Sequence, residues 1–447
     1  MEKCVHDELC GGCIYQGVPY EEQLKTKEEQ VKGYMLENGI KAEVFEKIEG
    51  APSLYHYRNK MDYTFGDLVK DGEMTLGMHQ KGRFMSIVTV DQCQLVPEDF
   101  NKILRATLEF CVERGYTKYH KRRHEGMMRN LVLRRGENTG EILINVVTQS
   151  DYGTVPPGLV NTDGTVMYSE EKYESGHFDE NAYAKMIESL DLDGEVCGIL
   201  RTINDDWSDA VKCDELRVLK GRDYYIEKIM GLDFKVSAFS FFHMNVPAVE
   251  RLYKEAIALV DDFAGKTVFD LFCGTGTITQ SMARSAGRAV GVEIVEDAVD
   301  AARKNAALNG LDNCEFIAGD VLKVLPAIKS GELLGSNAGD DGLMTSKTSG
   351  DADISEKPAG VVPVTPDVIV VDPPRAGIHP KVLPMIAEYG VDEILYISCN
   401  PKTMCKDLAV LQEYGYRVKY MKPYDNFPMT KHVECVCLLA KTSGSEV

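Results

Sequence analysis

A glycine-rich turn between two hydrophobic segments is the feature that most constrains the fold of this chain. Residues 266–272 read as a buried strand, which runs into Cys273-Gly274-Thr275-Gly276-Thr277 before a helix expected from about residue 278. The next hydrophobic segment, residues 288–292, ends in Glu293. Glycines let the backbone approach a ligand closely, and an acid about 20 residues further on accepts hydrogen bonds from ribose hydroxyls. The pattern predicts an α/β fold with a Rossmann-like cofactor site.

Two cofactor classes suit this pattern. Nicotinamide cofactors are one, but the third glycine of their fingerprint is missing. S-adenosylmethionine uses the same succession of strand, glycine loop, helix, strand and acid, without a pyrophosphate to cradle. A third segment, residues 314–318, ends at Gly319-Asp320, where the Asp320 carboxylate is placed to meet an adenine edge. Together these signals favour a methyltransferase fold.

A cysteine and two acids lie at the ends of other hydrophobic segments. Cys399 follows residues 393–398 and precedes Asn400-Pro401, which can cap and begin a helix. The positive end of that helix favours a thiolate, whereas a lone cysteine is more often a small buried side chain. Asp372 ends residues 367–371, and Glu434 precedes residues 435–439. Strand ends are where α/β enzymes place their sites, so these three are candidates for nucleophile, acid and base.

The motifs together resemble the RNA (uracil-5-)-methyltransferase family, whose members modify 23S ribosomal RNA or transfer RNA. The resemblance rests on Phe269-Asp270-Leu271-Phe272-Cys273-Gly274, Gly291-Val292-Glu293, Asp372-Pro373-Pro374-Arg375-Ala376-Gly377, Ser398-Cys399-Asn400-Pro401 and His432-Val433-Glu434, and further upstream on Tyr57-Arg58-Asn59-Lys60, Gly77-Met78-His79-Gln80-Lys81-Gly82 and Ser240-Phe241-Phe242-His243-Met244-Asn245. It covers nearly the whole chain.

The resemblance implies that the cofactor is S-adenosylmethionine. It implies cofactor-binding roles for His243, Phe272, Thr277, Glu293, Asp320 and Asp372. Family members usually carry Gln where this chain has His243, and often Asn where it has Thr277. Imidazole and hydroxyl groups still form hydrogen bonds, so we expect altered contacts with activity retained.

The chemistry explains the residue types. Carbon 5 of uracil is a poor nucleophile, but addition of the Cys399 thiolate to carbon 6 places negative charge on carbon 5. That carbon can then accept a methyl group, and Glu434 is the candidate base for its proton. The target base must leave its stack to reach the thiolate, so base flipping or a single-stranded target is expected.

The 13 cysteines are an odd number in a chain without a signal peptide or a transmembrane run, which predicts a reducing cytoplasm. Cys4, Cys10 and Cys13 fall in one short segment, and Cys93 is a distant fourth. Spacing alone leaves zinc and an iron–sulfur cluster open, since both accept four thiolates. The resemblance implies a [4Fe-4S] cluster at these four positions.

A net charge of −20 is unfavourable for binding phosphates. Residues 118–135, however, carry seven cations against the single acid Glu125, which favours a local RNA footprint over an ordinary solvated basic face. The cations are Lys118, Lys121, Arg122, Arg123, Arg129, Arg134 and Arg135.

Composition along the chain suggests three parts. Residues 1–53 form an iron–sulfur loop and a helix, 54–235 a β-rich central RNA-binding domain, and 236–447 a class I methyltransferase domain interrupted by a disordered insertion at about 330–366. We expect a cytoplasmic monomer, not bound to a membrane, that methylates a uridine of 23S ribosomal RNA.

Three alternatives stay open. One is a transfer RNA uridine methyltransferase. Another is an RNA 5-methylcytidine methyltransferase, which would typically carry a second cysteine after a proline near Asp372, where this chain has Arg375. The third is an iron–sulfur RNA-binding protein that has lost catalysis.

Overall fold

The computed structural model describes residues 3–154, 159–160, 166–167, 172–208, 210–260, 262–333 and 364–442. It divides into two compact units that alternate along the chain. The first comprises Met1–Gln30, Lys47–Lys254 and Pro423–Glu434; the second comprises Val31–Glu46, Glu255–Lys422 and Cys435–Val447. Helices α1 (Tyr20–Glu37) and α4 (Val246–Ala258) each run across a boundary between units. The predicted insertion at 330–366 lies mostly outside the described residues.

The first unit is built on a seven-stranded sheet of order β12-β11-β6-β5-β2-β3-β4. Adjacent strands in this sheet are antiparallel, except that β6 and β11 are parallel to each other. The strands are β2 (Lys60–Gly66), β3 (Thr75–Gln80), β4 (Arg83–Thr89), β5 (Met128–Arg135), β6 (Glu141–Thr148), β11 (Glu195–Ile203) and β12 (Glu215–Gly221).

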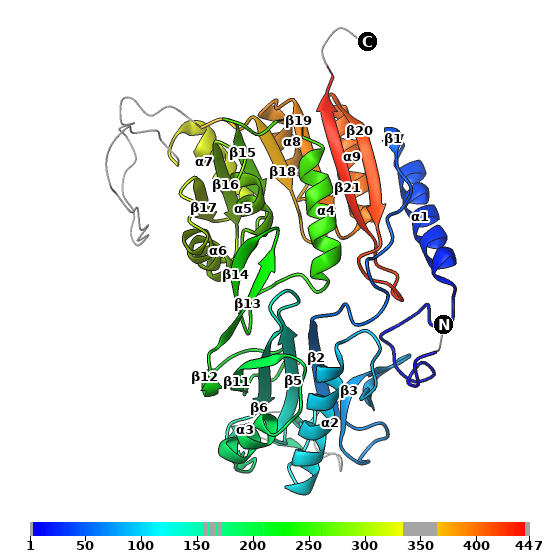
Figure 1. Cartoon of the computed structure of the whole chain (residues 1–447), viewed down its shortest axis with the longest axis vertical. Coiled ribbons are helices and arrows are strands. Elements are labelled where there is room, and N and C mark those ends of the chain that lie inside the picture. The colour runs from blue at the N-terminus through cyan, green and yellow to red at the C-terminus, as the bar shows by residue number, and fades with distance from the viewer. Residues whose placement is uncertain are drawn as a thin grey trace. The chain divides into compact units, whose positions relative to one another are not determined.

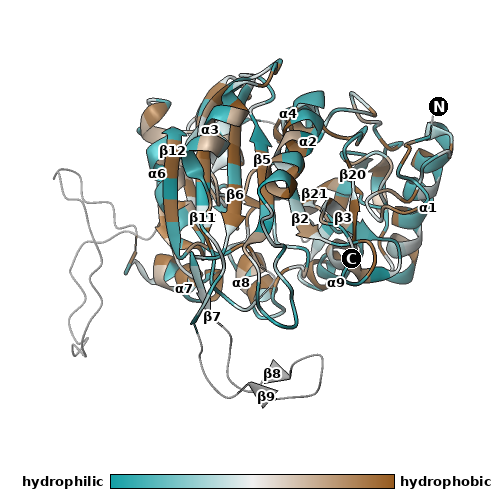
Figure 2. Ribbon diagram, turned by 90° about the horizontal axis from the view of Figure 1, so that it is seen from below, coloured by the Kyte–Doolittle hydropathy of each residue, from teal (hydrophilic) through white to brown (hydrophobic). Residues whose placement is uncertain are grey.

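Helices α2 (Glu98–Glu113) and α3 (Glu180–Glu188) pack against each other and contribute to the core of this sheet. Fully buried side chains of the core include Tyr63, Phe100 and Leu131. Hydrophobic residues along the strands, visible as brown segments in Figure 2, supply the surface that these helices cover. Burial of this apolar area is the main stabilising contribution to the unit.

Short hairpins extend from the first unit. They are β7 (Tyr152–Thr154) with β10 (Lys172–Glu174), β8 (Leu159–Val160) with β9 (Val166–Met167), and β13 (Tyr224–Ile229) with β14 (Leu232–Ser237). The β13 strand carries the buried acid Glu227, which accepts hydrogen bonds from the backbone N–H groups of Glu137 and Asn138.

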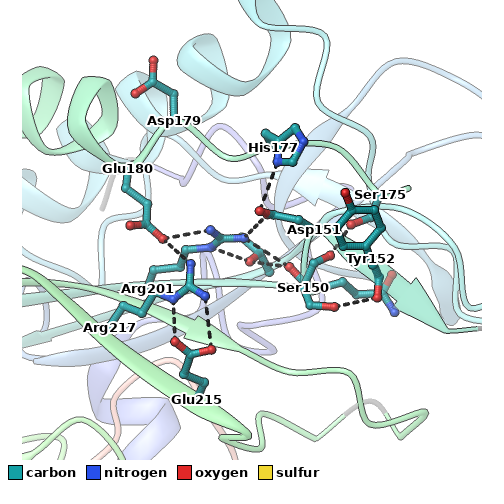
Figure 3. A network of polar contacts seen from close by, with 12 residues as sticks. Ser150, Asp151, Tyr152, Ser175, His177, Asp179, Glu180, Arg201, Glu215 and Arg217 are labelled. Atoms are coloured by element: carbon teal, nitrogen blue, oxygen red, sulfur yellow. Dashed lines mark hydrogen bonds and ion pairs between the residues drawn. The ribbon is translucent and has the colours of Figure 1, made fainter. Parts of the chain in front are cut away.

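A buried arginine ties the strands of the first unit to α3 (Figure 3). The Arg201 guanidinium on β11 donates to Glu180 Oε1 at 2.8 Å, to Thr148 Oγ1 at 2.9 Å and to Asp151 Oδ1 at 3.2 Å. Arg217 on β12 also donates to Glu180 Oε1, at 3.0 Å. Removing an unpaired charge from water costs several kcal/mol or more, so a buried guanidinium needs such a set of partners.

The second unit contains an eight-stranded sheet of order β1-β20-β21-β19-β18-β15-β16-β17 (Figure 1). Strands β15 to β19 are mutually parallel, and β21 runs antiparallel to β19. The strands are β1 (Ala42–Phe45), β15 (Thr267–Leu271), β16 (Arg288–Glu293), β17 (Cys314–Ala318), β18 (Val368–Val371), β19 (Glu393–Ser398), β20 (Tyr416–Tyr424) and β21 (Glu434–Lys441).

The parallel strands are covered by helices, which is why they read as continuous hydrophobic runs instead of alternating ones. Helices α5 (Thr277–Ala283), α6 (Glu296–Leu308) and α7 (Val321–Ser330) pack beside β15–β17, whereas α8 (Val382–Glu388) packs on α7 and α9 (Pro401–Glu413). All four residues of β18 are buried. Among the described residues, no helix combines the length and hydropathy that a membrane span requires.

Candidate active site

The carboxyl ends of the parallel strands bring most of the predicted residues of the second unit to one edge. The chain steps from β15 outward to β16 and β17, then returns to the other side of β15 for β18 and β19. This reversal creates a switch point between β15 and β18, the place where open α/β sheets bind ligands. The glycine loop follows β15 and Asp372 follows β18, so both predicted elements flank it.

The glycine loop departs from ordinary backbone geometry. Phe272 has a φ of 70°, Gly274 of 54° and Gly276 of 76°, all in the left-handed region that favours glycine. A Cβ atom at Gly276 would lie 2.7 Å from the Phe316 ring, so this glycine is required by packing. A Cβ at Gly274 would meet nothing within 4 Å, so that face of the loop is open to a ligand.

Glu293, the last residue of β16, is fixed by two backbone groups. Its Oε2 accepts the Gly274 N–H at 3.1 Å and its Oε1 accepts the Val295 N–H at 2.9 Å. The carboxylate therefore holds the glycine loop beside β16, and each oxygen can accept a further hydrogen bond. Asp320 follows β17 and caps α7, accepting the Leu322 N–H at 2.9 Å.

A carboxyl group that sequence reasoning missed lies beneath the loop. Asp270, inside β15, is fully buried and accepts a hydrogen bond from the Thr279 hydroxyl. Burial, with the charges of Asp372 and Glu293 adding to it, raises the pKa of Asp270 to about 8. Burial also raises the pKa of Asp372 to about 7, although part of its side chain remains accessible. An acid in the middle of a hydrophobic strand was the available signal for Asp270.

Cys399 lies at the turn between β19 and α9. Pro401 is the first residue of the helix, as predicted, and Asn400 occupies the N-cap position. The Asn400 side chain makes no cap hydrogen bond; its Nδ2 donates to the Arg375 carbonyl at 2.8 Å. The turn that carries the cysteine is thereby tied to the segment that follows Asp372.

Asp407 on α9 fixes the same segment from below. Its Oδ2 accepts the Ile378 N–H at 2.8 Å and the Tyr396 hydroxyl at 2.7 Å. Gly377, with a φ of 83°, passes so close that a Cβ there would lie 3.0 Å from Asp407 Oδ2. Sequence reasoning missed this acid, because a lone carboxylate on an amphipathic helix usually lies in solvent.

Glu434 begins β21, which pairs with β19. The last residue pair of this antiparallel ladder is Ser398 opposite Cys435. Cys399 follows Ser398, and Glu434 precedes Cys435, so both predicted catalytic residues leave the same end of the ladder.

His243 belongs to the first unit. Its ring Nε2 lies 2.8 Å from the Tyr253 hydroxyl, and its carbonyl accepts the Asn59 side-chain N–H at 3.1 Å. Burial lowers the pKa of His243 to about 4, so the imidazole is neutral at pH 7. A neutral ring has one N–H donor and one acceptor nitrogen, so, like an amide, it can both donate and accept a hydrogen bond.

The cysteine-rich segment lies along the β3–β4 hairpin. The Gly11 N–H donates to the His79 carbonyl at 3.0 Å and the Lys81 N–H donates to the Leu9 carbonyl at 2.8 Å. Burial, with a smaller contribution from the neighbouring cysteines, raises the pKa of Cys13 to about 12 and that of Cys93 to about 11. Cys4, Cys10, Cys13 and Cys93 are therefore electrostatic neighbours.

Comparison with known proteins agrees with this geometry. The family described as tRNA (Uracil-5-)-methyltransferase matches residues 364–442, and a methyltransferase domain matches residues 262–332. An uncharacterized RNA methyltransferase of Clostridium tetani is 41% identical over 97% of this chain and 82% of its own length. Another, of Caldanaerobacter subterraneus, is 42% identical over 98% and 84%.

The chain belongs to the RNA (uracil-5-)-methyltransferase family. The predicted family is thus confirmed. The crystal structure of a Pyrococcus abyssi tRNA (uracil-54, C5)-methyltransferase in complex with S-adenosyl-L-homocysteine shares the fold, with a TM-score of 0.68, 24% identity, and coverage of 97% of this chain and 86% of that one. The Rossmann-like methyltransferase fold of the prediction is confirmed as well.

The residues at the sheet edge of this RNA methyltransferase fit S-adenosylmethionine. The open face of Gly274 lets a cofactor approach the loop closely, and the Glu293 carboxylate can accept hydrogen bonds from ribose hydroxyls. Asp270 Oδ1 is buried and has no hydrogen-bond partner among the described residues. When bound, the cofactor supplies an electrophilic methyl group.

The four cysteines predicted to hold a cluster come from two segments of the first unit. Among the residues that the structure describes, no group of three or more His, Cys, Asp or Glu side chains is arranged to hold a metal ion. Cys4, Cys10 and Cys93 each influence the pKa of Cys13, so the four thiols lie near one another.

Fewer cations of residues 118–135 are accessible to RNA than the sequence suggests. Arg129 and Arg134 are buried in β5. Lys118 forms an ion pair with Asp67 at 2.7 Å, and Arg135 with Asp99 at 3.3 Å. The exposed or half-exposed cations that remain in this stretch are Lys121, Arg122 and Arg123.

Proposed function

We propose that this RNA methyltransferase methylates carbon 5 of a uridine in 23S ribosomal RNA through a covalent adduct with Cys399. The observation that carries the proposal is the shared end of the β19–β21 ladder, from which both Cys399 and Glu434 leave. A nucleophile and a base that act on neighbouring ring carbons must come from neighbouring positions.

The chain's own groups account for each bond. The Cys399 sulfur bonds to carbon 6 of the uracil, and the ring electrons move to carbon 5, which accepts the methyl group. Glu434 then takes the carbon-5 proton, and the returning electrons expel the thiolate. Without Glu434 the reaction would stop at a methylated RNA that is still linked to the thiol.

Cofactor binding is assigned to residues at the switch point. Glu293 accepts from the ribose, Asp320 meets the adenine edge, and Asp372 binds the amino group. Phe272 and Thr277 flank the glycine loop. His243 takes the place of the family's glutamine as a neutral hydrogen-bonding side chain, which its low pKa supports.

The substrate is tested by mapping 5-methyluridine by mass spectrometry in 23S ribosomal RNA and transfer RNA from a strain lacking this protein. Loss of one or more 5-methyluridines from 23S RNA is expected, and re-expression of the wild-type chain should restore them. If 5-methyluridine were lost from transfer RNA alone, transfer RNA and not 23S ribosomal RNA would be the substrate. Loss of 5-methylcytidine would mean that the protein methylates cytidine and not uridine, although Arg375 stands where a cytidine enzyme would be expected to carry a second catalytic cysteine.

A [4Fe-4S] cluster on Cys4, Cys10, Cys13 and Cys93 is a separate part of the proposal, supported by four neighbouring thiols from two segments. Protein purified without oxygen should be brown, with about four irons per chain. Cys93→Ala should lose the iron, while the buried thiol of Cys111 offers a matched control, and Cys111→Ala should keep it. One equivalent of zinc in colourless protein would contradict the cluster.

A further inference from the structure

Two exposed aromatic side chains lie on either side of a basic loop in the first unit. Phe84, on β4, is 62% exposed, and Trp207 is 45% exposed. Between them, residues 118–125 carry Lys121, Arg122 and Arg123. Exposed aromatic rings interleaved with cations are the composition of single-stranded nucleic-acid sites.

The loop contacts both rings. The Lys121 ammonium lies 4.7 Å from the centroid of the Phe84 ring, and the His124 ring centroid lies 6.4 Å from that of Trp207. Phe84 also stacks on His79, with centroids 4.5 Å apart and an interplanar angle of 12°. Phe84, the 118–125 loop and Trp207 therefore form one continuous surface, which we term the aromatic–basic band.

Hydrogen bonds tie the basic loop and the segment around Trp207 to the rest of the first unit. The Tyr119 hydroxyl lies 2.7 Å from His124 Nδ1, and the Tyr173 hydroxyl donates to the His124 carbonyl at 3.0 Å. The buried Arg129 guanidinium donates to the carbonyls of Asp206 at 2.7 Å and Ser208 at 2.6 Å, on both sides of Trp207. A surface ordered in advance loses less conformational entropy when a ligand binds.

The charges on the band suit a phosphate backbone. Arg83 and Arg122 are exposed and have no ion-pair partner among the described residues. Arg123 is only loosely paired, with Glu125 at 3.8 Å. The nearest acid on the Trp207 side, Asp206, is paired with Lys212 at 2.5 Å. Arg83 and Arg122 are therefore available to phosphates at the Phe84 side.

We propose that the aromatic–basic band binds an unpaired stretch of the substrate RNA by stacking bases on Phe84 and Trp207. This inference rests on the proposed RNA substrate and adds the surface that receives it. A base entering at Phe84 would displace Lys121 from the ring, which is favourable because an exposed cation–π contact is weaker than a base–aromatic stack.

Fluorescence anisotropy with the full chain tests the proposal, with a short fluorescein-labelled single-stranded RNA and no methyl donor. Phe84→Ala should weaken binding by about fivefold or more, the lower limit for losing one base stack. Phe84→Trp should retain the wild-type affinity. Tyr414, 43% exposed at the end of α9, offers a matched control, and Tyr414→Ala should bind as the wild type does. Equal affinity of Phe84→Ala and wild type would overturn the proposal.

The single tryptophan of the chain gives an independent readout. Trp207 emission should be quenched by the unlabelled RNA over the concentration range in which anisotropy saturates. Unchanged emission at saturation would remove Trp207 from the site and contradict the band. A fully paired RNA duplex should bind Phe84→Ala and the wild type with equal affinity, because its bases are already stacked. If Phe84→Ala lost as much affinity for the duplex as for single-stranded RNA, the stacking proposal would be wrong.

Failure of this inference and failure of the proposed function give different results. An intact band with no 5-methyluridine product would count against the reaction only. Normal methylation, with RNA affinity untouched by Phe84→Ala, would count against the band only. An unchanged melting temperature of Phe84→Ala would exclude misfolding as the cause of weaker binding.

Discussion

Asp270 and Asp372 show how two carboxyl groups of similar chemistry come to serve different purposes. Both have raised pKa values, but Asp270 is fully buried beneath the glycine loop while Asp372 keeps accessible surface at the strand end. The first is a neutral acid bonded to Thr279 at pH 7, and the second can reach a ligand. Burial, more than residue type, separates them.

Asp270→Asn should change the pH dependence of stability. The carboxyl pKa is near 3.8 in the unfolded chain and about 8 in the folded one, so the folded state binds more protons between those values. The wild-type free energy of unfolding should therefore fall as pH rises from 4 to 8, by at most about 1.4 kcal/mol per pH unit from this group. The asparagine variant should lack this component.

Urea unfolding of both proteins at pH 5 and pH 8 measures the effect. The variant should gain stability relative to the wild type at the higher pH. A constant difference between the two proteins would mean that Asp270 ionises normally in the folded state.

At the scale of elements, the site depends on how α9 holds the segment after β18. Asp407 accepts from Ile378 and Tyr396, and Asn400 donates to the Arg375 carbonyl. The segment between Asp372 and Ile378 is thus held by the same helix whose first turn follows Cys399, the proposed nucleophile. Asp407 is a positioning residue, because it reaches the reacting groups only through this segment.

Asp407→Ala should destabilise the protein by about 2 kcal/mol or more, since it leaves two buried donors without an acceptor. It should also lower kcat for methylation more than it raises KM for RNA, because Asp372, proposed to bind the cofactor, would shift. Tyr396→Phe is the matched control. It removes one of the two bonds, and should cost about 1 kcal/mol. Wild-type stability and kcat in Asp407→Ala would contradict the assignment.

The buried Arg201 plays the corresponding part in the first unit. Arg201→Met should destabilise the protein by about 3 kcal/mol, the low end for a broken buried pair, because Glu180 and Asp151 remain partly accessible to water. Arg217 is more exposed and shares Glu180, so Arg217→Met should cost less than about 1 kcal/mol. Urea unfolding of both variants measures these losses of stability. Equal losses for Arg201→Met and Arg217→Met would show that the burial of Arg201 adds nothing to the effect.

At the scale of the whole molecule, the sequence predicted the cofactor edge because each of its strands is a hydrophobic run that ends in a chemically distinctive residue. Glu293, Asp372 and Cys399 were visible for that reason. Asp270 and Asp407 were not, since their roles depend on what packs above them. The basic stretch was overestimated because Arg129 and Arg134 lie within a strand and are buried there.

For a similar reason, the sequence does not mark which short segments join which unit. Segments such as Pro423–Glu434 join the first unit through long-range bonds, among them Lys27 Nζ to Asp425 Oδ1 at 2.6 Å. Neither Lys27 nor Asp425 is marked by its neighbours in sequence. Pairings over such distances in the chain are decided by tertiary packing.

The most direct measurement of the central claim is denaturing electrophoresis of the Glu434→Gln protein after incubation with substrate RNA and S-adenosylmethionine. We predict a covalent protein–RNA species whose uracil already carries the new methyl group, because addition and transfer precede removal of the carbon-5 proton. The species should be absent in the Cys399→Ala, Glu434→Gln double variant. Normal turnover by Glu434→Gln, or an adduct that survives the loss of Cys399, would contradict the account.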